Sequence, residues 1–135
     1  MRIPILMFAA ALAAAGCEEN DGKGPPPSTL GGVDGVLDAW KKAGLTVSAF
    51  ENTDGAKYGG GDCRAGQING IDAVLCLYAS PELATAAQPK GLDAVGDATG
   101  SAIAEGKVLL VVVDRRKVDP EGRTINQATK AFRGR

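Results

Sequence analysis

Side chains that could do acid–base or metal chemistry gather in one loop of this sequence. Asp54 and Asp62 lie in the glycine-rich segment NTDGAKYGGGD, and Glu51 comes just before it. Carboxylates there could bind calcium weakly or serve a small enzyme, although their spacing differs from that of an EF-hand. The chain contains no histidine, which removes the usual general base and the commonest metal ligand. We therefore expect a solvated acidic loop without metal or other cofactor, and we assign no catalytic residue.

Two other segments resemble nucleotide-binding loops only in part. GSAIAEGKV ends in Gly-Lys, but its first glycine is one position away from P-loop spacing. Val108 also stands where a P-loop has the serine or threonine that binds magnesium. YGGGDC lacks the strand-to-helix context of a dinucleotide-binding loop. Neither segment predicts phosphate binding, and the few aromatic residues argue against nucleic-acid binding.

Cys63 and Cys76 are placed symmetrically about Asn69-Gly70, a dipeptide that favours a two-residue hairpin turn. Counting outward from this turn pairs Cys63 with Cys76 at a position without backbone hydrogen bonds, where side chains approach most closely. The β-carbon separation at such a pair suits a disulfide. The sequence therefore predicts a cross-strand disulfide, with two buried structural thiols as the alternative.

The N-terminus, MRIPILMFAAALAAAGCEEN, has the order of a secretory signal: one basic residue, an apolar stretch over 3–16, then small residues. That stretch has 14 residues, fewer than the roughly 20 that span a bilayer. AAGC resembles the lipobox of bacterial lipoproteins, although Ala14 stands where leucine is commonest. The resemblance implies cleavage after Gly16 and acylation of Cys17. The alternative is an ordinary signal peptide followed by a free cysteine.

This resemblance sets the expected domain organisation and location. It implies a signal peptide over 1–16, a lipidated Cys17 with a proline-rich tether over 17–29, and one domain over 30–135. The expected location is the cell envelope, lipid-anchored, on its periplasmic or outer face. Glu18 after the cysteine favours the outer over the inner membrane, by the sorting rule of enteric bacteria.

The pattern of the remaining chain predicts an α+β fold in the order α-β-β-β-α-β-α, with helices on an antiparallel or mixed sheet of about four strands. Residues 97–104 are ambiguous between a helix end, a loop and an edge strand. The last helix is expected to start with a capping box of Thr124 and Gln127. The other expected elements are a helix over 30–43, strands over 45–51, 63–68, 71–78 and 108–113, and a helix from Pro81 broken near Pro89 and Gly91.

Charge is uneven along the chain. Residues 114–135 carry seven basic and three acidic side chains, whereas residues 17–113 carry seven basic and thirteen acidic ones. The cluster Arg115, Arg116 and Lys117 is the candidate contact with an anionic lipid surface or an envelope protein. The alternative is a solvated strand end and terminal helix. Further cations follow in the chain: Arg123, Lys130, Arg133 and Arg135.

Three functions remain open at this level. The first is a non-catalytic binding or structural module near the membrane. The second is a small envelope enzyme that uses Asp54 and Asp62. The third is a subunit that docks through a bare sheet face around Val74 and Tyr78, if the helices crowd onto the other face.

Overall fold

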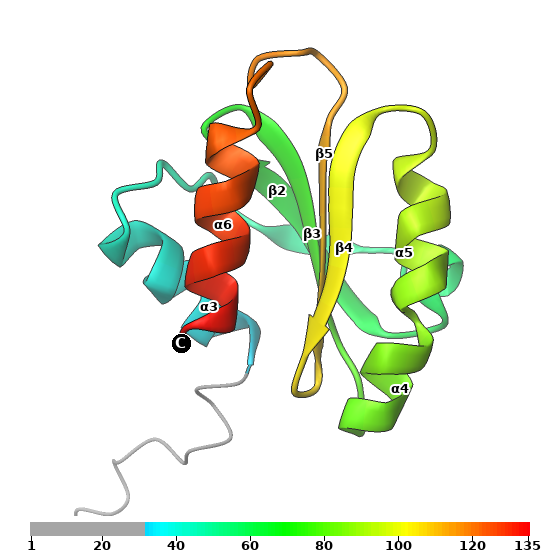
Figure 1. Ribbon diagram of the computed structural model, residues 1–135. Coiled ribbons are helices and arrows are strands. Elements are labelled where there is room, and N and C mark those ends of the chain that lie inside the picture. The colour runs from blue at the N-terminus through cyan, green and yellow to red at the C-terminus, as the bar shows by residue number, and fades with distance from the viewer. Residues whose placement is uncertain (1–31) are drawn as a thin grey trace, which may run out of the picture.

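Five antiparallel strands form one sheet within residues 32–135, which are the residues that the computed structural model describes. The strand order is β1-β2-β3-β5-β4, and helices pack against the sheet (Figure 1). The bounds are α3 Val33–Lys42, β1 Glu51–Thr53, η1 (a 3-10 turn) Ala56–Tyr58, β2 Asp62–Ile68, β3 Ile71–Leu77, α4 Pro81–Ala86, α5 Gln88–Val95, β4 Thr99–Glu105, β5 Val108–Asp114 and α6 Arg123–Arg133. The α+β class is confirmed, with an antiparallel sheet of five strands where about four were expected.

The N-terminal part of the chain lies outside the described residues. It holds the expected signal peptide 1–16, Cys17 and the tether 17–29, together with the expected start of the first helix at Leu30. Among residues 32–135, no helix is long and apolar enough to cross a membrane.

Strand β5 is an interior strand of the sheet, and its apolar run is buried on both faces. It lies between β3 and β4, and all seven of its residues are buried. This pairing also resolves the ambiguous region 97–104. Its Gly, Ala and Ser residues are weak strand formers, but seven residues of β4 pair in register with β5. The side-chain oxygen Oε1 of Gln88 accepts a hydrogen bond from the Ala104 amide at 2.8 Å on this edge strand.

The strand expected over 45–51 is largely wrong. An isolated bridge joins Val47 to Ile68, and regular pairing begins only at Glu51. Between them, the Ser48 hydroxyl replaces a backbone carbonyl as acceptor for the Gln67 amide, at 2.8 Å. The Phe50 ring also lies so close to Gly66 that an added β-carbon there would approach ring atom Cδ1 to 2.5 Å. The Ser48 hydroxyl therefore interrupts the ladder that an alternating pattern predicts.

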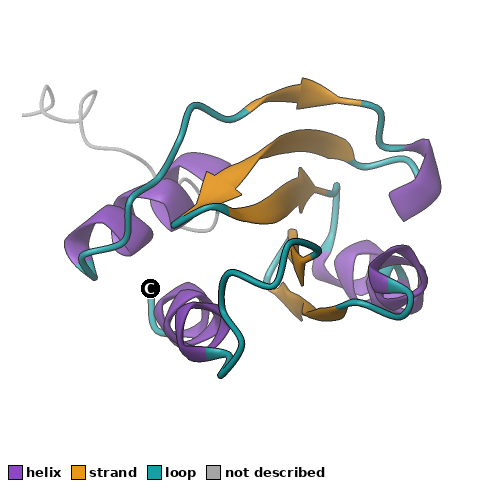
Figure 2. Ribbon diagram, turned by 90° about the horizontal axis from the view of Figure 1, so that it is seen from above, coloured by secondary structure: helices purple, strands orange, loops and turns teal. Residues whose placement is uncertain are grey.

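Helices cover both faces of the sheet. One core lies between the sheet and helices α3 and α6, and includes Trp40, Leu75 and Phe132. The other lies between the sheet and helices α4 and α5, and includes Cys76 and Leu109. Figure 2 shows α4 and α5 on the opposite side of the strands from α6. The hypothesis of a bare face around Val74 and Tyr78 is wrong, because Tyr78 is buried and Val74 is partly buried against the second core.

Local signals placed two helix ends correctly. The Ser80 hydroxyl accepts a hydrogen bond from the Leu83 amide at 3.2 Å, and Pro81 is the first residue of α4. At the end of α3, Gly44 has φ +90°, and the amides of Gly44 and Leu45 donate to the carbonyls of Lys41 and Trp40. That pair of bonds is the Schellman motif, which favours glycine at this position.

The expected capping box of Thr124 and Gln127 is wrong. Helix α6 has Gly122 as its N-cap, without a side-chain cap at that residue. The buried carboxylate of Asp119 accepts the hydrogen bond from the Ile125 amide at 3.0 Å instead. Asp114, also buried, accepts from the amides of Val118 and Asp119 at 3.0 and 2.8 Å. The side chains of Asp114 and Asp119 therefore hold the connection between β5 and α6 through hydrogen bonds to its backbone.

Candidate functional site

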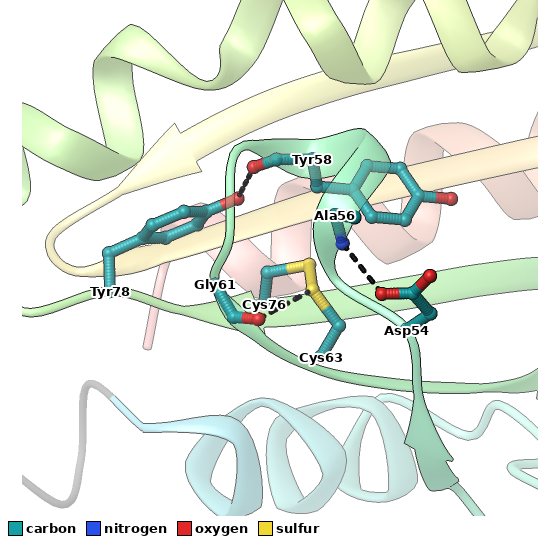
Figure 3. The surroundings of a disulfide bond; sticks show 7 residues. All are labelled: Asp54, Ala56, Tyr58, Gly61, Cys63, Cys76 and Tyr78. Atoms are coloured by element: carbon teal, nitrogen blue, oxygen red, sulfur yellow. Dashed lines mark hydrogen bonds between the residues drawn. A yellow bond between two sulfur atoms is a disulfide. The ribbon is translucent and has the colours of Figure 1, made fainter.

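The hairpin of β2 and β3 carries the disulfide that its sequence predicts. Asn69 and Gly70 have φ of 50° and 86°, and the register pairs Cys63 with Cys76. The two sulfurs are bonded, with the α-carbons 4.0 Å apart, and both residues are buried. The Cys63 sulfur lies 3.6 Å from the Gly61 carbonyl oxygen (Figure 3), a contact without a hydrogen, since a disulfide sulfur carries none. The disulfide therefore links β2 to β3 directly beside the glycine-rich loop.

The Tyr78 side chain holds the other side of this loop. The Tyr78 hydroxyl donates a hydrogen bond to the Tyr58 carbonyl oxygen, as Figure 3 shows. Gly61 lies against the Tyr78 ring, where an added β-carbon would approach ring atom Cζ to 2.7 Å. Burial raises the pKa of Tyr78 above its ordinary value, and the neighbouring Tyr58 raises it further. Burial also raises the pKa of Tyr58, against the lowering effect of the Arg115 charge.

The glycine-rich loop forms one wall of a pocket of about 400 Å³, which we call the glycine-loop pocket. Helices α4 and α5 form the opposite wall, and the stem of Lys90 lies over Gly59, 3.6 Å from the position of an added β-carbon. Leu77 and Leu83 are 37% and 52% exposed and add apolar surface to the lining. The lining consists of Gly59, Gly60, Gly61, Asp62, Leu77, Tyr78, Ala79, Leu83, Ala86, Ala87 and Lys90.

The structure separates the carboxylates that the sequence suggested as a catalytic group. Asp62 lines the glycine-loop pocket, but Asp54 does not, and its carboxylate accepts a hydrogen bond from the Ala56 amide at 2.9 Å. Glu51 is exposed on the edge strand β1. Within the described part of the chain, no three Asp, Glu, Cys or His side chains are grouped so as to hold a metal ion. The pocket thus offers one carboxylate and one ammonium group over an apolar lining.

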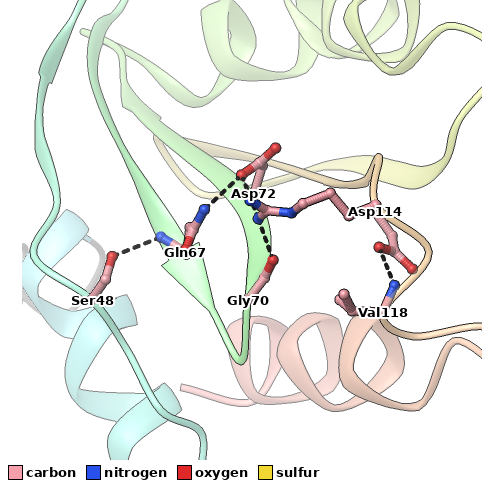
Figure 4. A network of polar contacts seen from close by, with 7 residues as sticks. Ser48, Gln67, Gly70, Asp72, Asp114 and Val118 are labelled. Carbon is pink, nitrogen blue, oxygen red and sulfur yellow. Dashed lines mark hydrogen bonds and ion pairs between the residues drawn. The ribbon is translucent and has the colours of Figure 1, made fainter.

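Two residues of the predicted basic contact, Arg115 and Arg116, form hydrogen bonds within the domain. Arg115 donates to the Ala94 carbonyl at 2.9 Å, at the end of α5. Arg116 donates to the Gly70 carbonyl and forms an ion pair with Asp72 at 3.3 Å. Figure 4 shows Gly70 and Asp72 in this polar network beside Gln67. Lys117, exposed at φ 60°, keeps its charge toward solvent. The two arginines therefore bond to segments that neighbour β5 while both remain exposed to solvent.

Sequence reasoning singled out Asp62 but missed Tyr78, Leu83 and Lys90 as parts of the same pocket. These residues are far from the glycine-rich loop in sequence, and none has a motif that marks it. Comparison with known proteins adds no further assignment: the chain matches no family model, no curated protein and no solved structure.

Proposed function

We propose that this chain is a lipid-anchored bacterial envelope protein whose α+β domain is a non-catalytic binding module. The observation that carries the proposal is the buried Cys63–Cys76 disulfide. Structural disulfides form and persist in exported proteins, whereas the bacterial cytosol keeps thiols reduced. The bond therefore supports export, which the signal-like N-terminus also predicts.

The count of cysteines supports the anchor. The chain has three cysteines, and two of them are bonded to each other, which leaves Cys17. An exported protein with a spare reactive thiol is unusual, and Cys17 stands where a lipobox cysteine would be acylated. Several acyl chains on one residue anchor a protein far more firmly than a single chain does.

The glycine-loop pocket supports binding over catalysis. An apolar lining with a few polar groups is the usual composition of a small-molecule site. Asp62 and Lys90 are oppositely charged side chains of this lining, and the exposed Leu83 offers an apolar contact. The enzyme hypothesis needs a second carboxylate beside Asp62, and Asp54 is bound in its own turn instead.

The anchor is tested by mass analysis of the purified chain and by Cys17→Ala. We expect acyl chains on an N-terminal Cys17 and loss of acyl labelling in the variant, with release from the membrane fraction. The control is Cys63→Ala/Cys76→Ala, which should keep its acyl label. Recovery of an unmodified, uncleaved chain from the cytosol would refute the proposal.

The pocket is tested by a photo-crosslinking side chain at position 83 in intact cells. Leu92 offers a matched control, because it is 51% exposed on the next helix but does not line the pocket. We expect a discrete adduct from position 83 and none from position 92. The adduct should disappear when Ala86→Phe fills the pocket. Equal adducts at both positions, or an adduct that survives Ala86→Phe, would exclude the pocket as the binding site.

A further inference from the structure

Every charged residue of helix α6 is basic. The helix, RTINQATKAFR, contains no acidic residue. Its apolar residues Ile125, Ala128 and Phe132 face the sheet, and this orientation directs the cations outward. The exposed residues of the helix are Arg123, Asn126, Gln127, Lys130 and Arg133, which we call the cationic face.

These cations are available for an external partner. Arg123 has one ion pair, with Glu121 at 2.9 Å, in which both side chains are largely exposed. Such exposed pairs are weak and exchange readily. No partner for the side chain of Lys130 or Arg133 is found among residues 32–135. The face differs from the exposed cluster at Arg115 and Arg116, where each guanidinium group also donates a hydrogen bond to a backbone carbonyl.

The cationic face lies on the side of the domain where the proposed tether enters. Described structure begins at Gly32, the N-cap of α3, and α3 packs beside α6 on the same face of the sheet. The two helices share a groove of about 450 Å³, and the C-terminus at the end of α6 lies beside α3 in Figure 1. The exposed charges of α3 do not oppose the face, since Asp34 and Asp38 are balanced by two lysines.

We propose that the cationic face docks on an anionic lipid surface and fixes the orientation of the domain. The inference rests on the proposed lipid anchor, which holds the domain near a bilayer. Fourteen residues separate Cys17 from Gly32, a reach of roughly 50 Å at full extension. A tethered face meets headgroups at high effective concentration, and this favours lipid over a diffusing acidic protein.

This orientation assigns opposite roles to the two faces of the sheet. Helix α6 covers the face toward the membrane, whereas α4 and α5 cover the other face and form a wall of the glycine-loop pocket. Docking through α6 turns that pocket away from the bilayer, where a ligand or partner can reach it. Figure 2 shows the two sets of helices on opposite sides of the strands.

Amine footprinting on vesicles tests the inference. The purified full-length chain is reconstituted on phosphatidylglycerol or phosphatidylcholine vesicles, and acetylation of Lys130 is compared with that of Lys90 in the pocket. Each cation near an anionic surface favours binding about fivefold, so three favour the docked state about a hundredfold. We expect Lys130 to react at least tenfold more slowly on phosphatidylglycerol vesicles than on phosphatidylcholine vesicles. Lys90 should react at the same rate on both kinds of vesicle. High salt should abolish the difference, because the screening length falls to about 3 Å at 1 M.

A matched pair of variants isolates the face. Arg123→Gln/Arg133→Gln keeps Lys130 as the probe, and should weaken its protection about fivefold for each charge removed. Lys57→Gln/Lys107→Gln removes the same charge from exposed positions outside α6, and should leave the protection unchanged. Equal loss in both variants would overturn the proposal, because it would reflect net charge alone.

The remaining outcomes separate this inference from the proposed anchor. Acyl chains on Cys17 with equal Lys130 reactivity on both vesicles would overturn the inference and leave the anchor standing. Protection on phosphatidylglycerol without acylation would refute the anchor and support the face. Protection of Lys130 in intact envelopes but not on vesicles would overturn the lipid proposal in favour of an acidic protein.

Discussion

The indole nitrogen of Trp40 donates a hydrogen bond to the Ala128 carbonyl oxygen at 2.9 Å, and both residues are fully buried. The bond joins α3 to α6 across most of the chain. The helix at which the described chain begins is thereby fastened to the helix that carries the cationic face.

Replacing Trp40 tests this fastening. Trp40→Phe removes the donor and part of the ring, and should lower the free energy of unfolding by about 2–3 kcal/mol. Trp40→Ala should cost about 3–5 kcal/mol, because it leaves a large cavity. Urea unfolding followed by circular dichroism measures both, with the exposed Leu92→Ala as control. A Trp40→Phe value within 0.5 kcal/mol of the wild type would contradict this account.

The disulfide should contribute substantially to stability. Cys63→Ala/Cys76→Ala opens a link between positions 13 residues apart, and should lower the free energy of unfolding by about 2–3 kcal/mol. Because both sulfurs are buried, reductant should act on the native protein only slowly. Denaturation with and without reductant measures the effect, and Cys17→Ala should behave as wild type. Two alkylatable thiols at these positions in the native protein would exclude the bond.

The start of α6 distinguishes two explanations of its capping. Asp119→Ala removes the acceptor of the Ile125 amide, and should cost about 1–2 kcal/mol of unfolding free energy. Thr124→Ala should cost only a few tenths, because the Thr124 hydroxyl caps no amide of the helix and accepts only a 3.4 Å bond from the Asn69 side chain. Thermal unfolding of the two variants, measured side by side, decides the matter. A larger loss of unfolding free energy for Thr124→Ala than for Asp119→Ala would support the capping box instead.

Alkaline pH should destabilise the fold through Tyr78. Its folded-state pKa is raised above the ordinary value of 10.0, so above that pH the folded state retains a proton that the unfolded state loses. Stability is therefore fully present below about pH 10 and falls as pH rises toward the folded-state pKa. Tyr78→Phe should flatten this fall relative to wild type, measured by unfolding between pH 8 and 11.5. An unchanged slope would contradict the role assigned to this hydroxyl.

Patterns carried by neighbouring residues predicted the corresponding structure well. Asn69-Gly70 determined the turn and therefore the register that bonds Cys63 to Cys76. Ser80-Pro81 determined the start of α4, and the apolar run from Val108 determined the central strand. In each case the decisive interaction joins positions close along the chain or follows from a simple alternation.

Sequence reasoning failed where the partner is distant or the local preference is weak. Residues 99–105 form a strand because β5 presents an open edge, although their own composition is neutral. Asp119 caps α6 from six residues away, through a connection whose path depends on Asp114. The strand expected after α3 is interrupted by the Ser48 hydroxyl, which takes the place of a backbone acceptor.

The candidate site shows the same division. By itself the sequence determined the pairing of two cysteines and the surplus of positive charge near the C-terminus, because each depends on residue type and short spacing. Only the tertiary structure decided that Asp62 lines the pocket without Asp54 and that Lys90 lies over the glycine-rich loop. It also decided that Arg115 and Arg116 donate hydrogen bonds to backbone carbonyls, whereas Lys130 and Arg133 face solvent. Packing sets these relationships because it brings together side chains that share no local backbone geometry.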